Sequence, residues 1–242
     1  MYSLQKARTG PTDTNIPIGR TKTLDRKQNS MPSVKIRPLA NSEDFYNLEN
    51  KYRPQTIGDP MAKIKIENVV ASTSLGQELD LQTIALSLDG AEYEPETFPG
   101  LIYRLKDPKA ATLLFRSGKV VCTGAKSLDH VNIAVAKVVR EMDKAGVKIE
   151  VEPKIEVQNI VASSDLGQEI NLNAMAITLG LDRVEYEPEQ FPGLVYRINE
   201  PKVVLLLFGS GKMVCTGAKK PQDVEAAVLK ITEELKAASL LR

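Results

Sequence analysis

Six basic residues stand at matching places in two halves of the chain and could hold phosphate groups. A single exposed lysine or arginine usually serves only as solubilising surface charge, whereas a set that recurs in order suggests a shared ligand. The first half contains Arg104, Lys119 and Lys126. The second half has Arg197, Lys212 and Lys219 at the equivalent positions of closely similar sequence. Basic side chains of this kind fix a protein on nucleic-acid phosphates. The recurrence therefore favours a phosphate-binding surface with approximate twofold symmetry.

Four of the five phenylalanines recur in the same way. Phe98 and Phe115 in the first half correspond to Phe191 and Phe208 in the second. Phe98 and Phe191 each open a Phe-Pro-Gly turn, where a large aromatic side chain is unusual. All four rings could belong to the core, but their loop positions and their pairing favour exposed rings that act on a partner.

The sequence offers little that could carry catalysis. His130 is the single histidine, and Cys122 and Cys215 occupy equivalent positions outside any CxxC motif. This pattern argues against a zinc site or a disulfide and is typical of small buried residues. The Gly-Ser-Gly-Lys segment at 209–212 lacks the spacing of a phosphate-binding loop, and Met213 stands where that loop needs Ser or Thr. No catalytic residue, metal or cofactor is predicted.

A long internal repeat must position these residues. The segments NVVAS, YEPETFPG and SGKVVCTGAK reappear as NIVAS, YEPEQFPG and SGKMVCTGAK. The copies differ in length at one place, where LDGAE at 88–92 becomes LGLDRVE at 179–185. Two copies predict two half-domains of the same shape, 61–152 and 153–242, packed about a pseudo-twofold axis.

The first 60 residues differ from the repeats. They are rich in Pro, Thr and Asn, carry ten Lys or Arg against six Asp or Glu, and show no sustained hydrophobic period. This composition predicts a mostly disordered extension, or an addition that precedes a natural start at Met61. No apolar run approaches the roughly 18–20 residues of a membrane span, and no signal-peptide core is present. A cytosolic protein without a membrane partner is expected.

Each repeat reads as the same order of elements. A strand, predicted at 64–71 and at 155–162, is followed by a short helix and by a short strand that ends at Pro95 or Pro188. The Phe-Pro-Gly loop, three more strands and a long amphipathic helix complete each repeat. The short helices are predicted at 81–88 and 172–179, and the long ones at 128–144, with Ser127 as its N-cap, and at 221–238. Each repeat is therefore predicted to supply a five-stranded antiparallel sheet and two helices. If both long helices cover one face of a continuous ten-stranded sheet, the other face is bare.

Strand parity selects the side chains on that bare face. Small residues suit the face under the helices, which leaves Asn, Val, Leu, Phe and Thr on the other. In the first repeat these are Asn68, Val70, Leu113, Phe115, Val121 and Thr123, and in the second Asn159, Val161, Leu206, Phe208, Val214 and Thr216. Such a face is too apolar to remain in water without a partner.

Residues 61–242 resemble the TATA-box-binding protein family, and its archaeal form in particular, because both repeats contain Phe-Pro-Gly. The resemblance rests on the repeated patterns around NVVAS, YEPE with FPG, and SGK with TGAK. One departure is Glu67, which stands where the family usually has Gln, whereas the second repeat keeps Gln158. The resemblance implies an α+β fold: a pseudo-twofold saddle with one ten-stranded curved antiparallel sheet and helices on its convex face.

The resemblance also implies roles for individual residues in binding the minor groove of TATA-box promoter DNA. Base contacts are expected from Asn68, Val70, Leu113, Val121, Thr123, Asn159, Val161, Leu206, Val214 and Thr216. DNA kinking is expected from Phe98, Phe115, Phe191 and Phe208. Phosphate contacts are expected from Arg104, Lys119, Lys126, Arg197, Lys212 and Lys219. Binding of transcription factor B is expected at Glu187 and Glu189, for which ordinary loop charge is the alternative.

The implied protein is a general transcription initiation factor that nucleates a preinitiation complex with transcription factor B and RNA polymerase. It is not an enzyme, and it acts at the nucleoid in the cytoplasm, or in the nucleus of a eukaryote. The apolar face also allows a homodimer when DNA is absent.

Two other hypotheses assign the protein to a different functional class. An enzyme or small-molecule carrier would need convergent polar groups in a closed cavity, and an interaction paralogue that has lost promoter binding would not need the retained Asn and Phe pairs.

Overall fold

A computed structural model describes residues 63–180 and 182–241, so the predicted extension at 1–60 lies outside the described residues. The described residues belong to one compact unit. They form two consecutive sets of the same elements. The first set is β1 (Lys65–Ser74), α2 (Leu81–Ser87), β2 (Ala91–Glu92), β3 (Gly100–Leu105), β4 (Ala110–Phe115), β5 (Lys119–Ala125) and α3 (Leu128–Lys144). The second set is β6 (Glu156–Asp165), α4 (Leu172–Leu179), β7 (Val184–Glu185), β8 (Leu194–Ile198), β9 (Val203–Leu207), β10 (Lys212–Ala218) and α5 (Pro221–Ala237).

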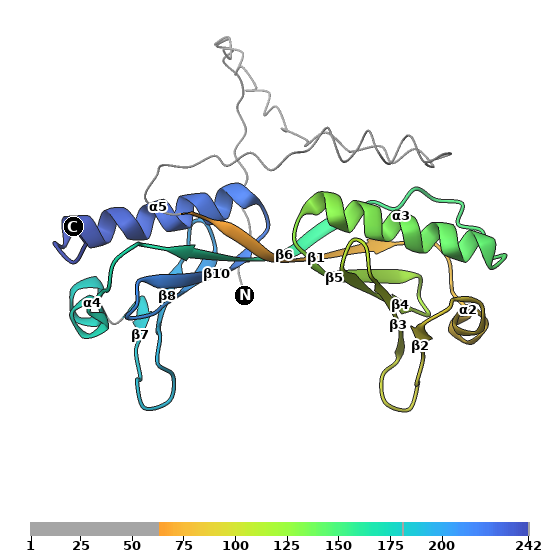
Figure 1. Cartoon of the computed structure of the whole chain (residues 1–242), viewed down its shortest axis with the longest axis horizontal. Coiled ribbons are helices and arrows are strands. Elements are labelled where there is room, and N and C mark those ends of the chain that lie inside the picture. The colour runs from red at the N-terminus through yellow and green to blue at the C-terminus, as the bar shows by residue number, and fades with distance from the viewer. Residues whose placement is uncertain (1–62, 181, 242) are drawn as a thin grey trace, which may run out of the picture. The chain divides into compact units, whose positions relative to one another are not determined.

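The strands form one ten-stranded antiparallel sheet in the order β2-β3-β4-β5-β1-β6-β10-β9-β8-β7. The order is symmetric about its centre, because the strands of the second repeat follow the central pair in the reverse order of their equivalents in the first repeat. β1 and β6 therefore pair at the centre, and each repeat extends outward to a two-residue edge strand. Figure 1 shows the two sets on either side of this central pair.

The long helices form where their sequence pattern predicts them. α3 begins after Ser127, whose side-chain oxygen accepts a hydrogen bond from the backbone N–H of His130 at 3.1 Å, which satisfies one of the free donors at a helix start. Its buried stripe includes Val131, Ala134 and Val138, and the predicted bounds are confirmed. α5 begins at Pro221 as predicted and ends one residue before the predicted end.

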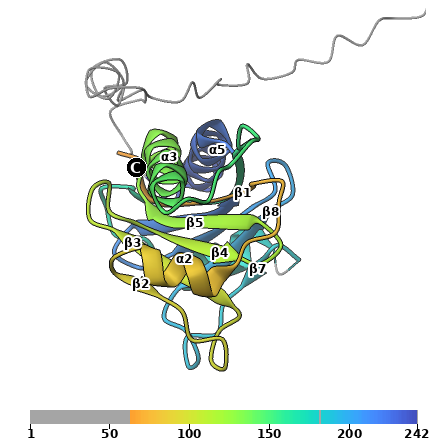
Figure 2. The same ribbon diagram turned by 90° about the vertical axis from the view of Figure 1, so that its right-hand side faces the viewer.

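Both long helices lie on the same side of the sheet in two perpendicular views (Figures 1 and 2). The loops that join β2 to β3 and β7 to β8 project on the opposite side. The sheet curves away from α3 and α5, so its uncovered face is concave. The predicted α+β fold, with helices on the convex face of a curved ten-stranded sheet, is confirmed.

Some predicted strand bounds were wrong. The first strand, expected at 64–71, continues to Ser74 because it pairs with β6 as far as Ser72 and with β5 as far as Ser74. The short strands were expected to reach Pro95 and Pro188, but β2 and β7 stop earlier. In each, only two residues pair with the neighbouring strand before the chain turns away into the loop.

Both cysteines lie in the core beneath the long helices. Cys122 and Cys215 are free thiols, each 1% exposed. Burial raises the pKa of each thiol to about 11, because the thiolate would lose its hydration. The prediction of small buried residues is confirmed.

Within 63–180 and 182–241, no helix combines the length and apolar character required to cross a bilayer.

Candidate nucleic-acid interface

The side chains predicted on the bare face lie on the concave face and are partly exposed. Along β4 and β5 they alternate with fully buried neighbours such as Leu114, Val120 and Cys122. β9 and β10 repeat this alternation. The concave face therefore carries the predicted Asn, Val, Leu, Phe and Thr side chains of both repeats. Strand parity identified this set correctly.

Cross-strand rows connect this set with the predicted phosphate-binding arginines. In the first repeat Arg104 pairs with Ala111, which pairs with Thr123, so the arginine shares a face with the threonine. Arg197 stands in the corresponding row with Thr216. The neighbouring rows also contain side chains that sequence reasoning missed, although strand parity could have found them: Ile102 and Ser72 in the first repeat, and Val195 and Ser163 in the second.

The two asparagines meet at the centre of the face. Asn68 on β1 pairs with Val161 on β6, and Asn159 on β6 pairs with Val70 on β1. The pair between Val69 and Ile160 lies between them, on the local twofold axis. The centre of the concave face therefore presents two amides and two valines in a symmetric arrangement.

Backbone hydrogen bonds fix which end of each amide points outward. The Oδ1 atom of Asn68 accepts from the backbone N–H of Gly124 at 2.7 Å, and its Nδ2 atom donates to Thr123 Oγ1 at 3.4 Å. The second repeat has the same contacts, with 2.7 Å from Gly217 and 3.2 Å to the Oγ1 atom of Thr216. An amide nitrogen carries two N–H groups. Each asparagine thus retains a donor for a partner on the concave face.

Sequence reasoning missed the role of the backbone N–H groups of Gly124 and Gly217. Both follow the threonine, next to a register shift in the pairing of β5 with β1 and of β10 with β6. A sequence signal for these two glycines was present, since Thr-Gly-Ala-Lys occurs in both repeats. The bulge directs an N–H toward the asparagine instead of the neighbouring strand.

The four phenylalanines form two edge-to-face pairs. The ring centroids of Phe98 and Phe115 are 5.9 Å apart at an interplanar angle of 65°, and those of Phe191 and Phe208 are 5.9 Å apart at 67°. All four are partly exposed. The glycine of each Phe-Pro-Gly turn makes room for its pair. A Cβ atom on Gly193 would lie 2.6 Å from a ring carbon of Phe191.

The basic side chains are exposed, and several have acidic partners. Arg197 holds Glu185 with two hydrogen bonds of 3.1 Å, and this carboxylate raises the pKa of the arginine. Arg104 Nε lies 3.5 Å from a carboxylate oxygen of Glu92. Each arginine thus has a glutamate on the adjacent edge strand, which a DNA phosphate would have to displace.

The lysines lie at the ends of the fifth strand of each repeat. Lys119 and Lys212 begin β5 and β10, and Lys126 and Lys219 follow their last residues. Lys126 Nζ is 3.9 Å from a carboxylate oxygen of Glu67.

Glu187 and Glu189 are exposed in the loop between β7 and β8. The backbone carbonyl of Glu187 accepts from the N–H groups of Gln190 and Phe191, at 2.9 Å each. The same turn therefore carries the predicted partner-binding glutamates and places Phe191 at the edge of the concave face.

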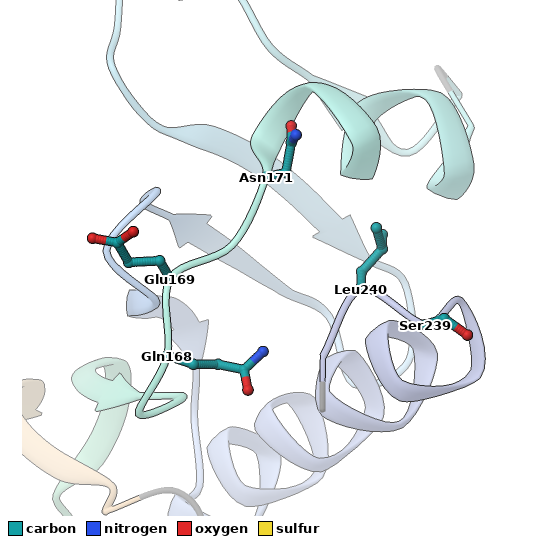
Figure 3. A pocket seen from close by; sticks show the side chains of 5 residues that line it. All are labelled: Gln168, Glu169, Asn171, Ser239 and Leu240. Atoms are coloured by element: carbon teal, nitrogen blue, oxygen red, sulfur yellow. The ribbon is translucent and has the colours of Figure 1, made fainter.

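A cavity of about 480 Å³ lies between the turn before α4 and the end of α5, away from the concave face. Its lining consists of Gln168, Glu169, Asn171, Ser239 and Leu240 (Figure 3). No group of three or more potential metal ligands occurs among the described residues. Four of its five lining residues are polar, whereas small-molecule sites are typically lined mostly by hydrophobic and aromatic side chains.

Comparisons with known proteins agree with this geometry. A family model described as transcription factor TFIID, or TATA-binding protein, matches residues 63–145 and 154–238. TATA-box-binding protein E of Halobacterium salinarum is 61% identical over 183 residues, which cover 76% of this chain and 98% of the relative. The TATA-box-binding protein of Thermoplasma volcanium is 60% identical over 179 residues, covering 74% and 97%. A solved structure of Methanococcus jannaschii TBP is similar at 53% identity with a TM-score of 0.66, covering 72% of this chain and 98% of that one.

Proposed function

Because this chain belongs to the TATA-binding protein family, we propose that it is a general transcription initiation factor that binds TATA-box promoter DNA through its concave face. The observation that carries the proposal is the pair of oriented amides at the centre of a symmetric apolar face. The family is not enzymatic. The repeats 61–152 and 153–242 are each assigned half of the DNA site.

The minor groove matches this face chemically. A·T and T·A pairs present only the acceptors adenine N3 and thymine O2 there, whereas G·C pairs add the guanine amino group. Asn68 and Asn159 offer outward N–H donors, and their threonine neighbours support them. The surrounding apolar side chains tolerate either orientation of an A·T pair but would leave a guanine amino group without an acceptor. Selection of A·T over G·C follows from this arrangement.

The Phe pairs would kink the DNA at both ends of the site. Phe98 with Phe115, and Phe191 with Phe208, would insert between base pairs, which partly unstacks those steps. This family is the standard example of such kinking, with bends of about 80° that describe the family and not a measurement on this chain. Pyrimidine–purine steps such as TA unstack most easily, so DNA deformability adds to the selection.

The basic side chains would hold the phosphates on either side of the groove. Arg104, Lys119, Lys126 and their repeat equivalents are exposed and near the edges of the concave face. For the arginines, a phosphate would replace Glu92 or Glu185 as the partner. Exposed ion pairs of this kind contribute only about 0–1 kcal/mol, so the exchange costs little.

Further partners follow from the loops and the apolar face. We assign Glu187 and Glu189 to contacts with transcription factor B, because they are exposed on a projecting loop next to the DNA-binding face. The resulting complex recruits RNA polymerase. Without DNA, a second copy could cover the apolar face as a homodimer.

A titration of two duplexes of equal length tests the proposal. One duplex contains a TA-rich centre and the other a GC-rich centre, and fluorophores at the two ends report bending by energy transfer. The TA-rich duplex is expected to bind more tightly and to bring its ends closer. Equal affinity for both duplexes, or tight binding without bending, would contradict the proposal.

A further inference from the structure

The connector between the repeats covers a turn of the first repeat. After α3 the chain folds back across the turn that follows β1, and the side-chain amide of Gln77 donates to the backbone carbonyl of Lys148 at 3.0 Å. A Cβ atom on Gly76 in this turn would lie 2.9 Å from a methyl carbon of Val151. The connector is therefore in direct contact with the turn.

The equivalent turn of the second repeat follows β6 and has similar geometry. Gly167 corresponds to Gly76, and their φ angles are +76° and +71°. The neighbouring long helix also ends in the same way in both repeats. A residue with positive φ follows the C-cap of each, which is Gly146 after α3 and Ser239 after α5.

The two turns differ in what lies over them among the described residues. No described atom lies within 4 Å of a Cβ atom placed on Gly167, whereas Val151 lies against Gly76. The cavity of about 480 Å³ between this turn and the end of α5 includes the adjacent Gln168 in its lining (Figure 3). The second repeat therefore has a groove at the place where the first repeat holds an extended segment of chain.

The residues before β1 correspond to the connector. β1 and β6 are equivalent strands that pair about the twofold axis, so the chain that enters β1 corresponds to the connector that enters β6. The described residues follow this symmetry, because Ile64 packs on the core of the second repeat as Ile155 packs on the core of the first. Counting back from these two isoleucines, Pro60 corresponds to Val151.

The sequence just before the described residues suits this position. Asp59 and Pro60 correspond to Glu150 and Val151, so an acid is followed by an apolar residue in both segments. A proline fixes its own φ near −65° and favours an extended conformation of the residue before it. Such a pair loses little further conformational freedom when it lies across a turn.

We propose that residues 56–62 lie across the turn at Gly167 and complete the second repeat, as residues 147–153 do at Gly76. This inference does not depend on DNA binding. The last residues of the N-terminal extension are then part of the fold, and the remainder of the extension leaves the protein at the second repeat. A chain that began at Met61 would lose most of this covering segment.

A disulfide tests this position in the full chain. A Cβ atom on Gly76 would lie 3.6 Å from the Cβ atom of Val151, within the range of about 3.5–4.5 Å that disulfides require. Gly76→Cys with Val151→Cys is therefore the reference pair, and Gly167→Cys with Pro60→Cys is the test pair. Mild oxidation followed by a non-reducing gel gives the rate of closure. The test pair should close about as fast as the reference pair.

Gly167→Cys with Ser42→Cys is the matched control, because it keeps the same position in the second repeat and moves its partner along the extension. This pair should close much more slowly. The native thiols are buried and have pKa values raised to about 11, so they should not take part. The inference is overturned if the test pair closes no faster than the control pair.

A second measurement leaves Gly167 unchanged. Replacing residues 56–60 by glycine and serine at constant length removes the apolar contact of Pro60 and should lower the midpoint of urea unfolding. The same replacement of residues 36–40 should leave the midpoint where it is in the unmodified chain. Equal midpoints for the two replacements would overturn the inference, also in the case that the cysteine variants fail to fold.

Discussion

The concave faces of the two repeats are nearly identical, whereas the regions behind them differ. On the face, the contacts of Asn68 and Asn159 agree to within 0.2 Å, and both Phe pairs have the same centroid separation. Behind the face, the second repeat has a polar network that the first lacks. Symmetry is thus retained on the concave face, and it is lost where each half has only its own core to stabilise.

The network comes from the longer connection between α4 and β7. Its Arg183 donates to Tyr196 Oη at 3.2 Å and to the carbonyl of Leu179 at 3.2 Å. The Tyr196 hydroxyl donates in turn to Glu234 on α5 at 2.7 Å. In the first repeat the shorter Asp-Gly connection supplies no arginine, and Glu141, which corresponds to Glu234, pairs with Lys144 instead.

The largest effect on the free energy of unfolding is expected at the glycine in the turn before the last strand of each repeat. Comparing the two glycines tests whether the repeats are equivalent at this turn. Gly118 and Gly211 have φ of +80° and +83°, and a Cβ atom would lie 2.1 Å and 2.0 Å from a backbone oxygen. Gly118→Ala and Gly211→Ala should each reduce the free energy of unfolding by about 3 kcal/mol or more, since strain adds to overlap with rigid backbone. Urea unfolding measures both.

Gly90→Ala is the control for this pair, because φ is +78° but no described atom lies within 4 Å of the new Cβ. It should cost only the conformational strain of about 1–2 kcal/mol. A large difference between Gly118→Ala and Gly211→Ala would show that the repeats are not equivalent here.

An intermediate effect should appear at the polar network. Tyr196→Phe removes a buried hydroxyl from a charged acceptor and should cost about 1.5–3 kcal/mol. Tyr103→Phe, at the corresponding position of the first repeat, should stay within about 0.5 kcal/mol. Equal losses in urea unfolding would refute the claimed difference between the repeats.

The same tyrosine predicts a dependence on pH. Burial, followed by the bond to Glu234, raises the pKa of Tyr196 from 10.0 to about 12. The protonated phenol is favoured in the folded state, so its contribution is complete below pH 10 and is lost as the pH rises toward 12. The stability gap between the unmodified chain and Tyr196→Phe should therefore narrow over that interval.

A smaller effect on folding than at Tyr196 is expected at the Phe pairs, where the repeats should again agree. Phe98→Ala and Phe191→Ala each remove one edge-to-face contact between partly exposed rings, for which about 0.5–1.5 kcal/mol is typical. Each variant should bend the TA-rich duplex less, with little change in the salt dependence of binding that is expected from the basic residues. Normal bending by both variants would show that the rings do not act as wedges.

The repeat made much of this fold predictable. Two copies of one pattern fixed the order of elements, and alternation along β4, β5, β9 and β10 identified the concave face. The orientation of the asparagine amides was not predictable, because it depends on a bulge that turns the N–H groups of Gly124 and Gly217 toward them. The contact between Glu67 and Ser163 was also hidden, since it joins residues of different repeats through the register of β1 with β6.

The central strand pair bears on how a molecule of this kind can arise. Without its neighbour, β1 would present a ten-residue unpaired edge, and so would β6. Each edge complements a copy of itself, because Asn68 faces Val161 just as Asn159 faces Val70. A protein with one copy of the repeat could therefore build the same sheet as a homodimer. Duplication and fusion of its gene would join the two subunits and free each half to change separately.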